Sequence, residues 1–149
     1  MVSMETVAKT KLKAFVQQIR VRYSEVDQLG IAYYAHYLVW LEVARVEYLR
    51  YLGIAYGELE KKGVKLPVRS CSITYLVPVR YDDLLNIHTV LTKIGRTSIT
   101  FEYEIIHDKT HEKLTTAETT LVCVDSDLRP VRLPKILTQY FPASASPKV

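Results

Sequence analysis

The pattern of apolar and polar residues predicts one strand and one long helix in the first third of the chain. Residues 14–23 alternate between the two kinds, as in a strand with one covered face. In residues 37–52, twelve of the sixteen residues are apolar or aromatic and the apolar stripe recurs at helical spacing. Gly53 follows where glycine commonly ends a helix. Two short helical turns are expected over residues 55–62, closed by Gly63.

The pattern of the remaining chain is that of β-strands. Runs rich in strand-forming residues occupy 64–79, 84–94, 97–107 and 113–125. In the third run Ile99, Phe101 and Tyr103 fall on one face and polar residues on the other, so one face is expected to be packed. Between the second and third runs, Gly95-Arg96 predicts a two-residue hairpin turn of type II′. A short helix is expected over residues 134–141, with a proline at its start.

This order predicts an α+β fold, in which an antiparallel sheet of about five strands wraps around one central helix. The sheet is expected to combine the first strand with a meander of the four later strands. The apolar face of a single sheet needs a cover, and only residues 37–52 are long and apolar enough to supply it. That helix is therefore expected to be largely enveloped. The free sheet edges predict self-association.

Residues 1–149 are expected to form one domain, with flexible ends at residues 1–12 and 142–149. Two pairs of opposite charge are expected along the predicted helix, because Glu42 and Arg45, and likewise Glu47 and Arg50, have i,i+3 spacing.

Charge and composition narrow the range of partners. The chain carries 20 basic and 16 acidic residues, a net charge of +4, which favours anionic partners. No block of basic residues and no known motif indicates nucleic acid. The uncharged run at residues 31–41 is too short to span a membrane, and the first residues show no signal-peptide pattern, so a cytoplasmic protein is expected. Cys71 and Cys123 fit no metal or redox spacing and are expected to be ordinary strand residues.

Several familiar catalytic motifs are absent from the sequence. It contains no G-x-S-x-G nucleophile elbow, no phosphate-binding G-x-x-x-x-G-K-[ST] loop and no G-x-G-x-x-G. His107 and His111 have a spacing that metal sites use, but they flank a predicted hairpin loop without further ligands nearby. They are therefore expected to be solvated, and neither a metal nor a cofactor is predicted.

Asp27 lies in a polar loop just before the long helix, and the sequence of this loop allows two roles for it. It is either a turn residue with an Asx-type hydrogen bond, followed by Gly30 in an unusual conformation, or part of a reaction site. The helix is expected to begin near Tyr34 or Ala35, where the first N–H groups lack partners and carry partial positive charge. Such groups stabilise an oxyanion, and a nearby carboxylate can attack a carbonyl or activate water.

The motif D-x-x-G-x-x-Y-Y-x-x-Y at residues 27–37 resembles the signature of the 4-hydroxybenzoyl-CoA thioesterase family, which includes the acyl-CoA thioesterases of the Tol–Pal cluster. The similarity extends over roughly residues 14–135 and includes the stretches Trp40-x-Glu42-x-Ala44-Arg45 and Gly95-Arg96-Thr97-Ser98. The resemblance implies the hotdog fold, sites at a dimer interface and often a tetramer of paired dimers, so a homodimer or homotetramer is expected.

The resemblance also implies roles for individual residues. Asp27 falls on the family's catalytic aspartate, and Tyr34 on the residue whose backbone N–H polarises the thioester carbonyl. Many relatives have His at the position of Tyr34 and Asn at the position of His36, so His36 departs from the commoner pattern. Lys93 and Arg96 are candidates to contact the phosphates of CoA, with a solvated turn as the alternative.

Two other carboxylates compete with Asp27 for a catalytic role. Glu25 lies outside the motif, and Glu42 is expected to pair with Arg45. The sequence thus predicts a hydrolase of acyl-CoA thioesters, with Asp27 as nucleophile or general base. The alternatives are an acyl-carrier-protein thioesterase, for which the basic surplus suits an acidic carrier, and a non-catalytic acyl-CoA-binding protein on the same fold. Aromatic and fatty acyl groups both remain open.

Overall fold

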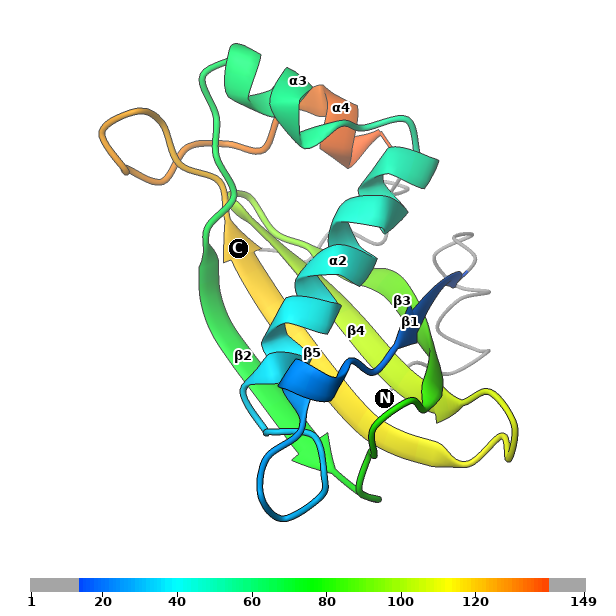
Figure 1. The fold of residues 1–149 in the computed structure, drawn as a ribbon. Coiled ribbons are helices and arrows are strands. Elements are labelled where there is room, and N and C mark those ends of the chain that lie inside the picture. The colour runs from blue at the N-terminus through cyan, green and yellow to red at the C-terminus, as the bar shows by residue number, and fades with distance from the viewer. Residues whose placement is uncertain (1–13, 140–149) are drawn as a thin grey trace.

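A computed structural model describes residues 14–139, and Figure 1 shows how their helices and strands are arranged. The predicted flexible ends, residues 1–12 and 142–149, lie outside the described residues. The elements are β1 (Phe15–Arg20), the 3-10 turn η1 (Tyr23–Glu25), α2 (His36–Tyr51), α3 (Tyr56–Lys61), β2 (Val68–Tyr75), β3 (Leu84–Ile94), β4 (Ser98–His107), β5 (Lys113–Val122) and α4 (Lys135–Thr138).

The five strands form one antiparallel sheet in the order β1-β3-β4-β5-β2. The predicted four-stranded meander is wrong in one respect, because β2 pairs with β5 and not with β3. The exit of β2 is held beside β5 by the amides of Leu76 and Val77, which donate to the carbonyl of Leu114 over 2.9 and 3.1 Å. The following segment then crosses to the opposite side of the sheet, where Val21 donates to the carbonyl of Asp83 over 2.9 Å. Both β1 and β2 are therefore edge strands.

Helix α2 packs along one face of the sheet and forms the core with it (Figure 1). The predicted packed face of β4 is confirmed, since Ile99, Phe101, Tyr103 and Ile105 are fully buried. The helix contributes the large buried side chains Trp40, Leu41, Tyr48 and Leu49. The opposite side of α2 stays open, and Leu38, Val39 and Val43 are exposed there. The expectation of a largely enveloped helix therefore holds only for the side that faces the sheet.

One of the two predicted ion pairs on α2 is wrong. Arg50 pairs with Glu47 over 3.4 Å as expected. Arg45, however, is only 7% exposed, and its Nη1 donates to the hydroxyl of Tyr103 over 3.3 Å. The same rotation of the helix that buries its large apolar residues also turns Arg45 toward the sheet, while Glu42 stays on the exposed side.

Two local predictions also need correction. The first strand ends at Arg20, because the chain turns into η1 where a carboxylate oxygen of Glu25 accepts from the amide of Arg22 over 2.8 Å. The β3–β4 turn is not type II′, since Gly95 does not have a positive φ. The amide of Gly95 donates to the carbonyl of Ser98 over 2.7 Å, and a Cβ on Gly95 would lie 2.7 Å from the Ser98 hydroxyl oxygen. A side chain at position 95 would therefore require the Ser98 hydroxyl to move, while the nearest backbone atom, the Ser98 carbonyl oxygen, is at an ordinary contact distance of 3.5 Å.

His111 is exposed as predicted, but His107 is not solvated, because its side chain is only 19% exposed and its Nε2 lies 3.4 Å from the Asp83 carboxylate. Most of the remaining predictions agree with the structure. The short turns after α2 form α3, and Gly63 has a φ of +80°. Pro134 immediately precedes α4, although the predicted end of that helix, residues 140–141, lies outside the described residues. Cys71 is exposed in β2 and Cys123 is buried one residue beyond β5, and both thiols are free. No helix within residues 14–139 combines the length and the apolar character needed to cross a bilayer.

Candidate active site

The loop that carries Asp27 is closed by its own hydrogen bonds. The amide of Asp27 donates to the carbonyl of Ile31 and the amide of Gly30 donates to the carbonyl of Asp27, each over 3.0 Å. Gly30 has a φ of +79°, a conformation that favours glycine. The Oδ1 atom of Asp27 accepts from the amide of Leu29 over 2.8 Å, which is the predicted Asx turn. Within residues 14–139 the carboxylate makes no ion pair and no other hydrogen bond, so Oδ2 keeps its lone pairs free.

The base of this loop is fixed to α2 through Glu25. A bridge between Val26 and Ala32 joins the two arms of the loop, and the amide of Tyr33 donates to the carbonyl of Glu25 over 2.8 Å. The side chain of Glu25 accepts from the indole N–H of Trp40 over 2.8 Å. Burial alone raises the pKa of Glu25, but hydrogen bonds from the Arg22 amide, the Trp40 indole and the Arg22 guanidinium together hold it below its usual value.

The start of α2 lies next to the Asp27 loop, as predicted. Ala35 is the residue before the first helical turn, and the amide of His36 donates back to the carbonyl of Tyr33 over 3.0 Å. The amide of Tyr34 has no acceptor among the described residues. The carbonyl of Tyr34 accepts from the hydroxyl of Tyr75 over 2.8 Å. An unpaired N–H at the positive end of a 16-residue helix is suited to bind a partly negative oxygen.

Asp27 and Tyr34 line the same cavity, which measures about 450 Å³. Such a volume lies within the usual range for small-molecule sites. The rest of the wall is apolar or aromatic and comes from the Asp27 loop, the start of α2 and the end of β2: Leu29, Ile31, Ala32, Tyr37, Tyr75, Leu76, Val77 and Pro78. The structure therefore brings a carboxylate, an unpaired helix amide and an apolar wall to one place.

Two tyrosines of this wall were not predicted as site residues. The rings of Tyr37 and Tyr75 meet edge to face with centroids 4.8 Å apart. Burial raises the pKa of Tyr37 to about 12. Burial also raises the pKa of Tyr75, and the neighbouring Cys71 and Tyr34 add to the effect. Both phenols thus remain neutral hydrogen-bond donors at physiological pH. The abundance of tyrosine suggested polar-tipped aromatic surfaces, but it did not indicate which residues would form them.

Tyr33 and His36 pack beside the site. The two rings meet edge to face with centroids 5.9 Å apart, and the ring of Tyr33 also lies 4.8 Å from that of Tyr34. Hydrogen bonding to Tyr34 and the charge of Asp27 raise the pKa of Tyr33. The side chain of His36 does not belong to the wall of the cavity.

Lys93 and Arg96 do not approach Asp27 within one chain. The Asp27 loop lies at the entry to β3, where Ala32 donates to the carbonyl of Val79 over 2.7 Å. Both basic residues are exposed at the other end of β3. Because β3 has 11 residues and a strand rises about 3.3 Å per residue, roughly 30 Å separate them from the loop.

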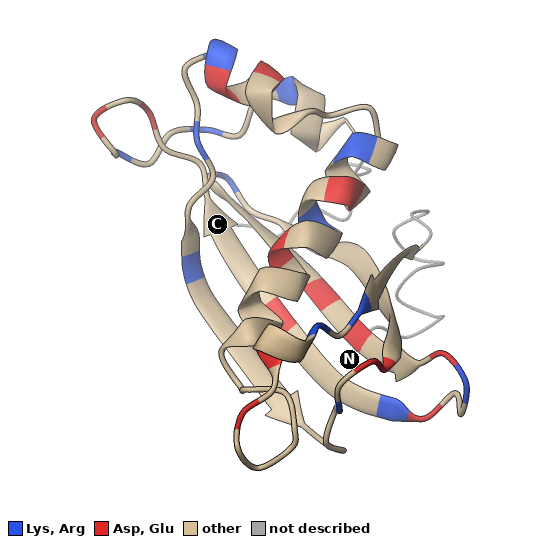
Figure 2. Cartoon of the chain, viewed as in Figure 1, with Lys and Arg blue, Asp and Glu red and all other residues tan. Residues whose placement is uncertain are grey.

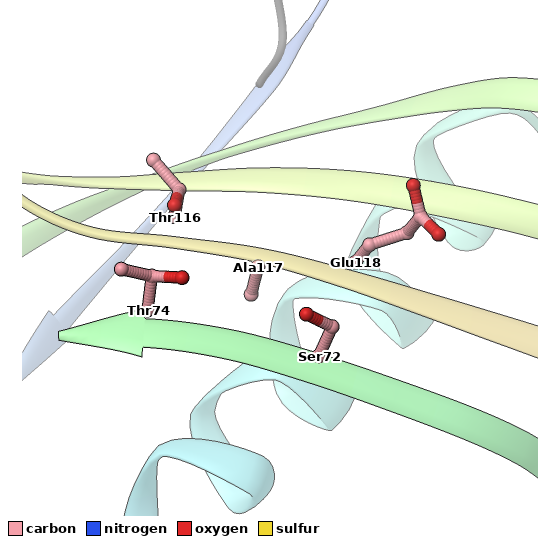
Figure 3. A pocket seen from close by; sticks show the side chains of 5 residues that line it. All are labelled: Ser72, Thr74, Thr116, Ala117 and Glu118. Carbon is pink, nitrogen blue, oxygen red and sulfur yellow. The ribbon is translucent and has the colours of Figure 1, made fainter.

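A second, smaller hollow of about 200 Å³ lies between β2 and β5. Figure 3 shows its polar side chains on the face of the sheet away from α2: Ser72, Thr74, Thr116 and Glu118. Figure 2 shows further acidic residues along the neighbouring strand β4. This hollow contains no helix terminus and no apolar wall, so the cavity at Asp27 is the better candidate for a site that binds an acyl group.

Residues 21–141 match the family described as the thioesterase-like superfamily. The chain belongs to this superfamily. It is 35% identical over 124 residues to the acyl-CoA thioester hydrolase YbgC of Escherichia coli, covering 83% of this chain and 92% of that protein. It is 29% identical over 124 residues to the acyl-acyl carrier protein thioesterase ATL2 of Arabidopsis thaliana, covering 83% of this chain and 66% of that protein.

A solved structure agrees with these sequence relatives. The DHNA-CoA thioesterase of Staphylococcus aureus superimposes with a TM-score of 0.79 at 32% identity, covering 85% of each chain. The predicted hotdog fold is confirmed, because the five-stranded antiparallel sheet packed on one long helix is shared with this thioesterase. The predicted enzyme class, a thioester hydrolase, is confirmed as well.

Proposed function

We propose that this thioesterase hydrolyses acyl-CoA thioesters at the cavity lined by Asp27 and Tyr34. One observation carries the proposal: a carboxylate with an unpaired oxygen and an unpaired helix amide share one apolar cavity. A carboxylate that acts as base or nucleophile and an amide that binds the oxyanion are together sufficient for thioester hydrolysis without a serine or cysteine nucleophile. The names of the relatives support CoA as the carrier of the acyl group. The reaction is assigned to the cytoplasm, in keeping with two free thiols.

In the proposed reaction, the acyl group lies against the apolar wall and its carbonyl oxygen accepts from the Tyr34 amide. As a general base, Asp27 takes a proton from water, and the hydroxide adds to the carbonyl carbon. The negative charge then develops on the oxygen next to the Tyr34 N–H. When the C–S bond breaks, the electron pair leaves with sulfur, which takes up the proton. As a nucleophile, Asp27 instead forms an acyl anhydride and releases the CoA thiolate, and water then cleaves the anhydride.

The two competing carboxylates are less suited to this role. Both oxygens of Glu25 already accept hydrogen bonds, and its side chain is buried away from the cavity wall. Glu42 is exposed on the open side of α2 and does not line the cavity. Asp27 is therefore the carboxylate that we assign to the reaction.

A role for Lys93 and Arg96 in binding CoA phosphates would require a second copy of the chain, since roughly 30 Å separate them from Asp27. Edge strand β2 exposes seven of its eight residues, and Val68 and Tyr75 near its ends are large and exposed. Two such edges related by a twofold axis pair antiparallel. The Val68 end of one copy, with its β3–β4 turn, would then lie toward the cavity of the other. We therefore propose a homodimer, or a tetramer of such dimers.

The experiment that tests the assignment is a steady-state assay of a panel of aromatic and fatty acyl-CoA substrates with a thiol reagent. Asp27→Asn is expected to lower kcat at least about 100-fold, because a general base or nucleophile contributes this much or more. Asp127→Asn is the matched control, since Asp127 is an exposed turn residue far along the chain. Full activity of Asp27→Asn would overturn the assignment.

One alternative substrate is supported by a relative, the acyl carrier protein thioesterase. Activity on acyl groups linked to a carrier protein, but not on the same groups linked to CoA, would select it. A non-catalytic acyl-CoA-binding protein on the same fold would instead bind CoA esters without turnover in the same assay.

A further inference from the structure

Glu25 is a charged residue in an apolar setting. Its side chain lies between η1 and α2, and the residue is only 2% exposed. An isolated carboxylate costs several kcal/mol to bury unless hydrogen bonds replace its lost hydration. The hydrogen-bond donors that replace water around Glu25 therefore show which parts of the structure its side chain connects.

Three donors satisfy the carboxylate of Glu25. The amide of Arg22 bonds to Oε1 over 2.8 Å, and the Arg22 guanidinium lies 3.3 Å from Oε2. The indole N–H of Trp40 bonds to Oε2 over 2.8 Å. Arg22 belongs to the same turn as Glu25, whereas Trp40 lies in the second turn of α2, fifteen residues along the chain. The Trp40 bond is thus the one that connects the turn with the helix.

The Asp27 loop and the start of α2 are both linked to the hydrogen bond between Glu25 and Trp40. Asp27 follows Glu25 by two residues, and the carbonyl of Glu25 holds the amide of Tyr33, the residue before Tyr34. On the helix side, the ring of Trp40 packs against that of Tyr37 with centroids 4.7 Å apart, and Tyr37 lines the cavity. A shift of Glu25 relative to Trp40 would therefore move the Asp27 loop relative to α2, which begins two residues after Tyr34.

We propose that Glu25 is a positioning residue of this thioesterase, whose hydrogen bond to Trp40 sets the Asp27 carboxylate in register with the Tyr34 amide. It acts through these two groups and does not touch the substrate. The inference rests on the proposed function, because it assumes that Asp27 and Tyr34 act together on one thioester. In enzymes generally, misplacement of a reacting group by about 1 Å costs roughly 100-fold in rate.

The test compares Glu25→Gln with Trp40→Phe. Glutamine keeps an acceptor for the Arg22 amide, but its NH2 group would face the indole N–H of Trp40, so that two donors meet. Phenylalanine removes the same bond from the other side and leaves the carboxylate and its Arg22 donors in place. Each variant is expected to lower kcat about 10- to 100-fold with KM within about twofold of the wild type. The double variant is expected to be no worse than either single variant, because both remove one interaction.

A second readout does not depend on catalysis. Amide hydrogen exchange is expected to become faster at Asp27, Gly30 and Tyr33, whose amides are bonded within the loop, and to stay unchanged in the core strands. Trp40 is the only tryptophan of the chain, so its fluorescence reports the loss of the bond in Glu25→Gln directly. Glu47→Gln is the control on α2, since it removes a half-buried carboxylate that pairs with Arg50 and does not line the cavity.

Three results would overturn the proposal: kcat within twofold of the wild type in Trp40→Phe, a loss of kcat with unchanged exchange at the loop amides, or faster exchange throughout the sheet, which would show general destabilisation. Should Glu25→Gln fail to fold, Trp40→Phe retains the ion pair between Arg22 and Glu25 and decides the question. A wild-type protein without thioesterase activity would refute the proposed function, while the exchange and fluorescence measurements would still test the connection between Glu25 and Trp40.

Discussion

The hydroxyl of Tyr75, at the end of edge strand β2, donates a 2.8 Å hydrogen bond to the carbonyl of Tyr34, two residues before α2. The bond joins residues 41 positions apart in the chain, and both of them line the cavity. It fixes the backbone of the residue whose amide we assign to the oxyanion. The edge strand therefore takes part in forming the site.

Tyr75→Phe is expected to lower kcat about fivefold. The substitution removes the hydroxyl and keeps the ring that packs on Tyr37, and a neutral hydrogen bond contributes about 1 kcal/mol. Steady-state kinetics on the best acyl-CoA substrate would measure the effect. Tyr81→Phe is the control, because Tyr81 is exposed, packs edge to face on Tyr23 and does not line the cavity that holds Tyr34 and Tyr75. Equal rates for the two variants would contradict the role of the Tyr75 bond.

Gly30→Ala is expected to reduce both stability and activity. A Cβ at this position would meet no atom within 4 Å, so the cost comes from the φ of +79° alone and amounts to about 1 kcal/mol. Gly57→Ala provides the comparison, since Gly57 also has free space but lies inside α3. There alanine is expected to stabilise by up to about 1 kcal/mol. Urea unfolding of both variants would test the difference, and a stable, fully active Gly30→Ala would refute it.

The hydrogen bonds of Glu25 predict a stability change at acidic pH. Because its pKa in the folded protein is below the ordinary value of 4.5, folding favours the ionised form. This contribution is complete above pH 4.5 and is lost as pH falls through the lower folded-state value. Glu25→Gln is therefore expected to flatten the dependence of the unfolding free energy on pH below 4.5. Chemical denaturation between pH 3 and pH 6 would measure it, and parallel curves for variant and wild type would contradict the prediction.

If the dimer forms through β2, a charged substitution on edge strand β2 should weaken it, whereas the same substitution on edge strand β1 should not. Val68 on β2 and Val16 on β1 are exposed to a similar degree, 47% and 45%. Val68→Lys would place a charge where a second copy is expected to pack, and the dimer dissociation constant is expected to rise at least about tenfold. Val16→Lys is expected to leave the dimer intact. Sedimentation velocity over a concentration series would distinguish the variants, and a monomeric wild type would refute the proposal.

The sequence predicted those features that depend on local patterns. The packed face of β4 followed from strict alternation, and the extent of α2 from its length and the glycine after it. The Asx turn at Asp27 and the start of the helix near Ala35 followed from residue types at neighbouring positions. These features depend on interactions within a few residues, which a pattern in the chain reflects.

Features that depend on distant pairing were missed. Strand β2 joins β5 because of contacts that its own sequence does not distinguish from contacts with β3. The position of Tyr75 in the cavity follows from that pairing and was therefore not predicted either. Arg45 was assigned to Glu42 by spacing alone, although the rotation of α2 turns it toward Tyr103. Glu25 was set aside because it lies outside the motif, whereas its partner Trp40 is reached only in the folded chain.

The buried Arg45 helps to fix the rotation of α2 about its own axis. Apolar residues occur on both the covered and the open side of this helix, so hydrophobic burial alone discriminates poorly between rotations. Arg45 does discriminate, because its guanidinium meets the Tyr103 hydroxyl, which in turn lies 2.7 Å from the hydroxyl of Thr119. A helix rotated about its axis would lose this contact and carry Arg45 away from Tyr103. The contact between Arg45 and Tyr103 in the middle of α2 thereby fixes the rotation of the helix about its axis. That rotation determines which way the free N–H groups at the start of α2 point.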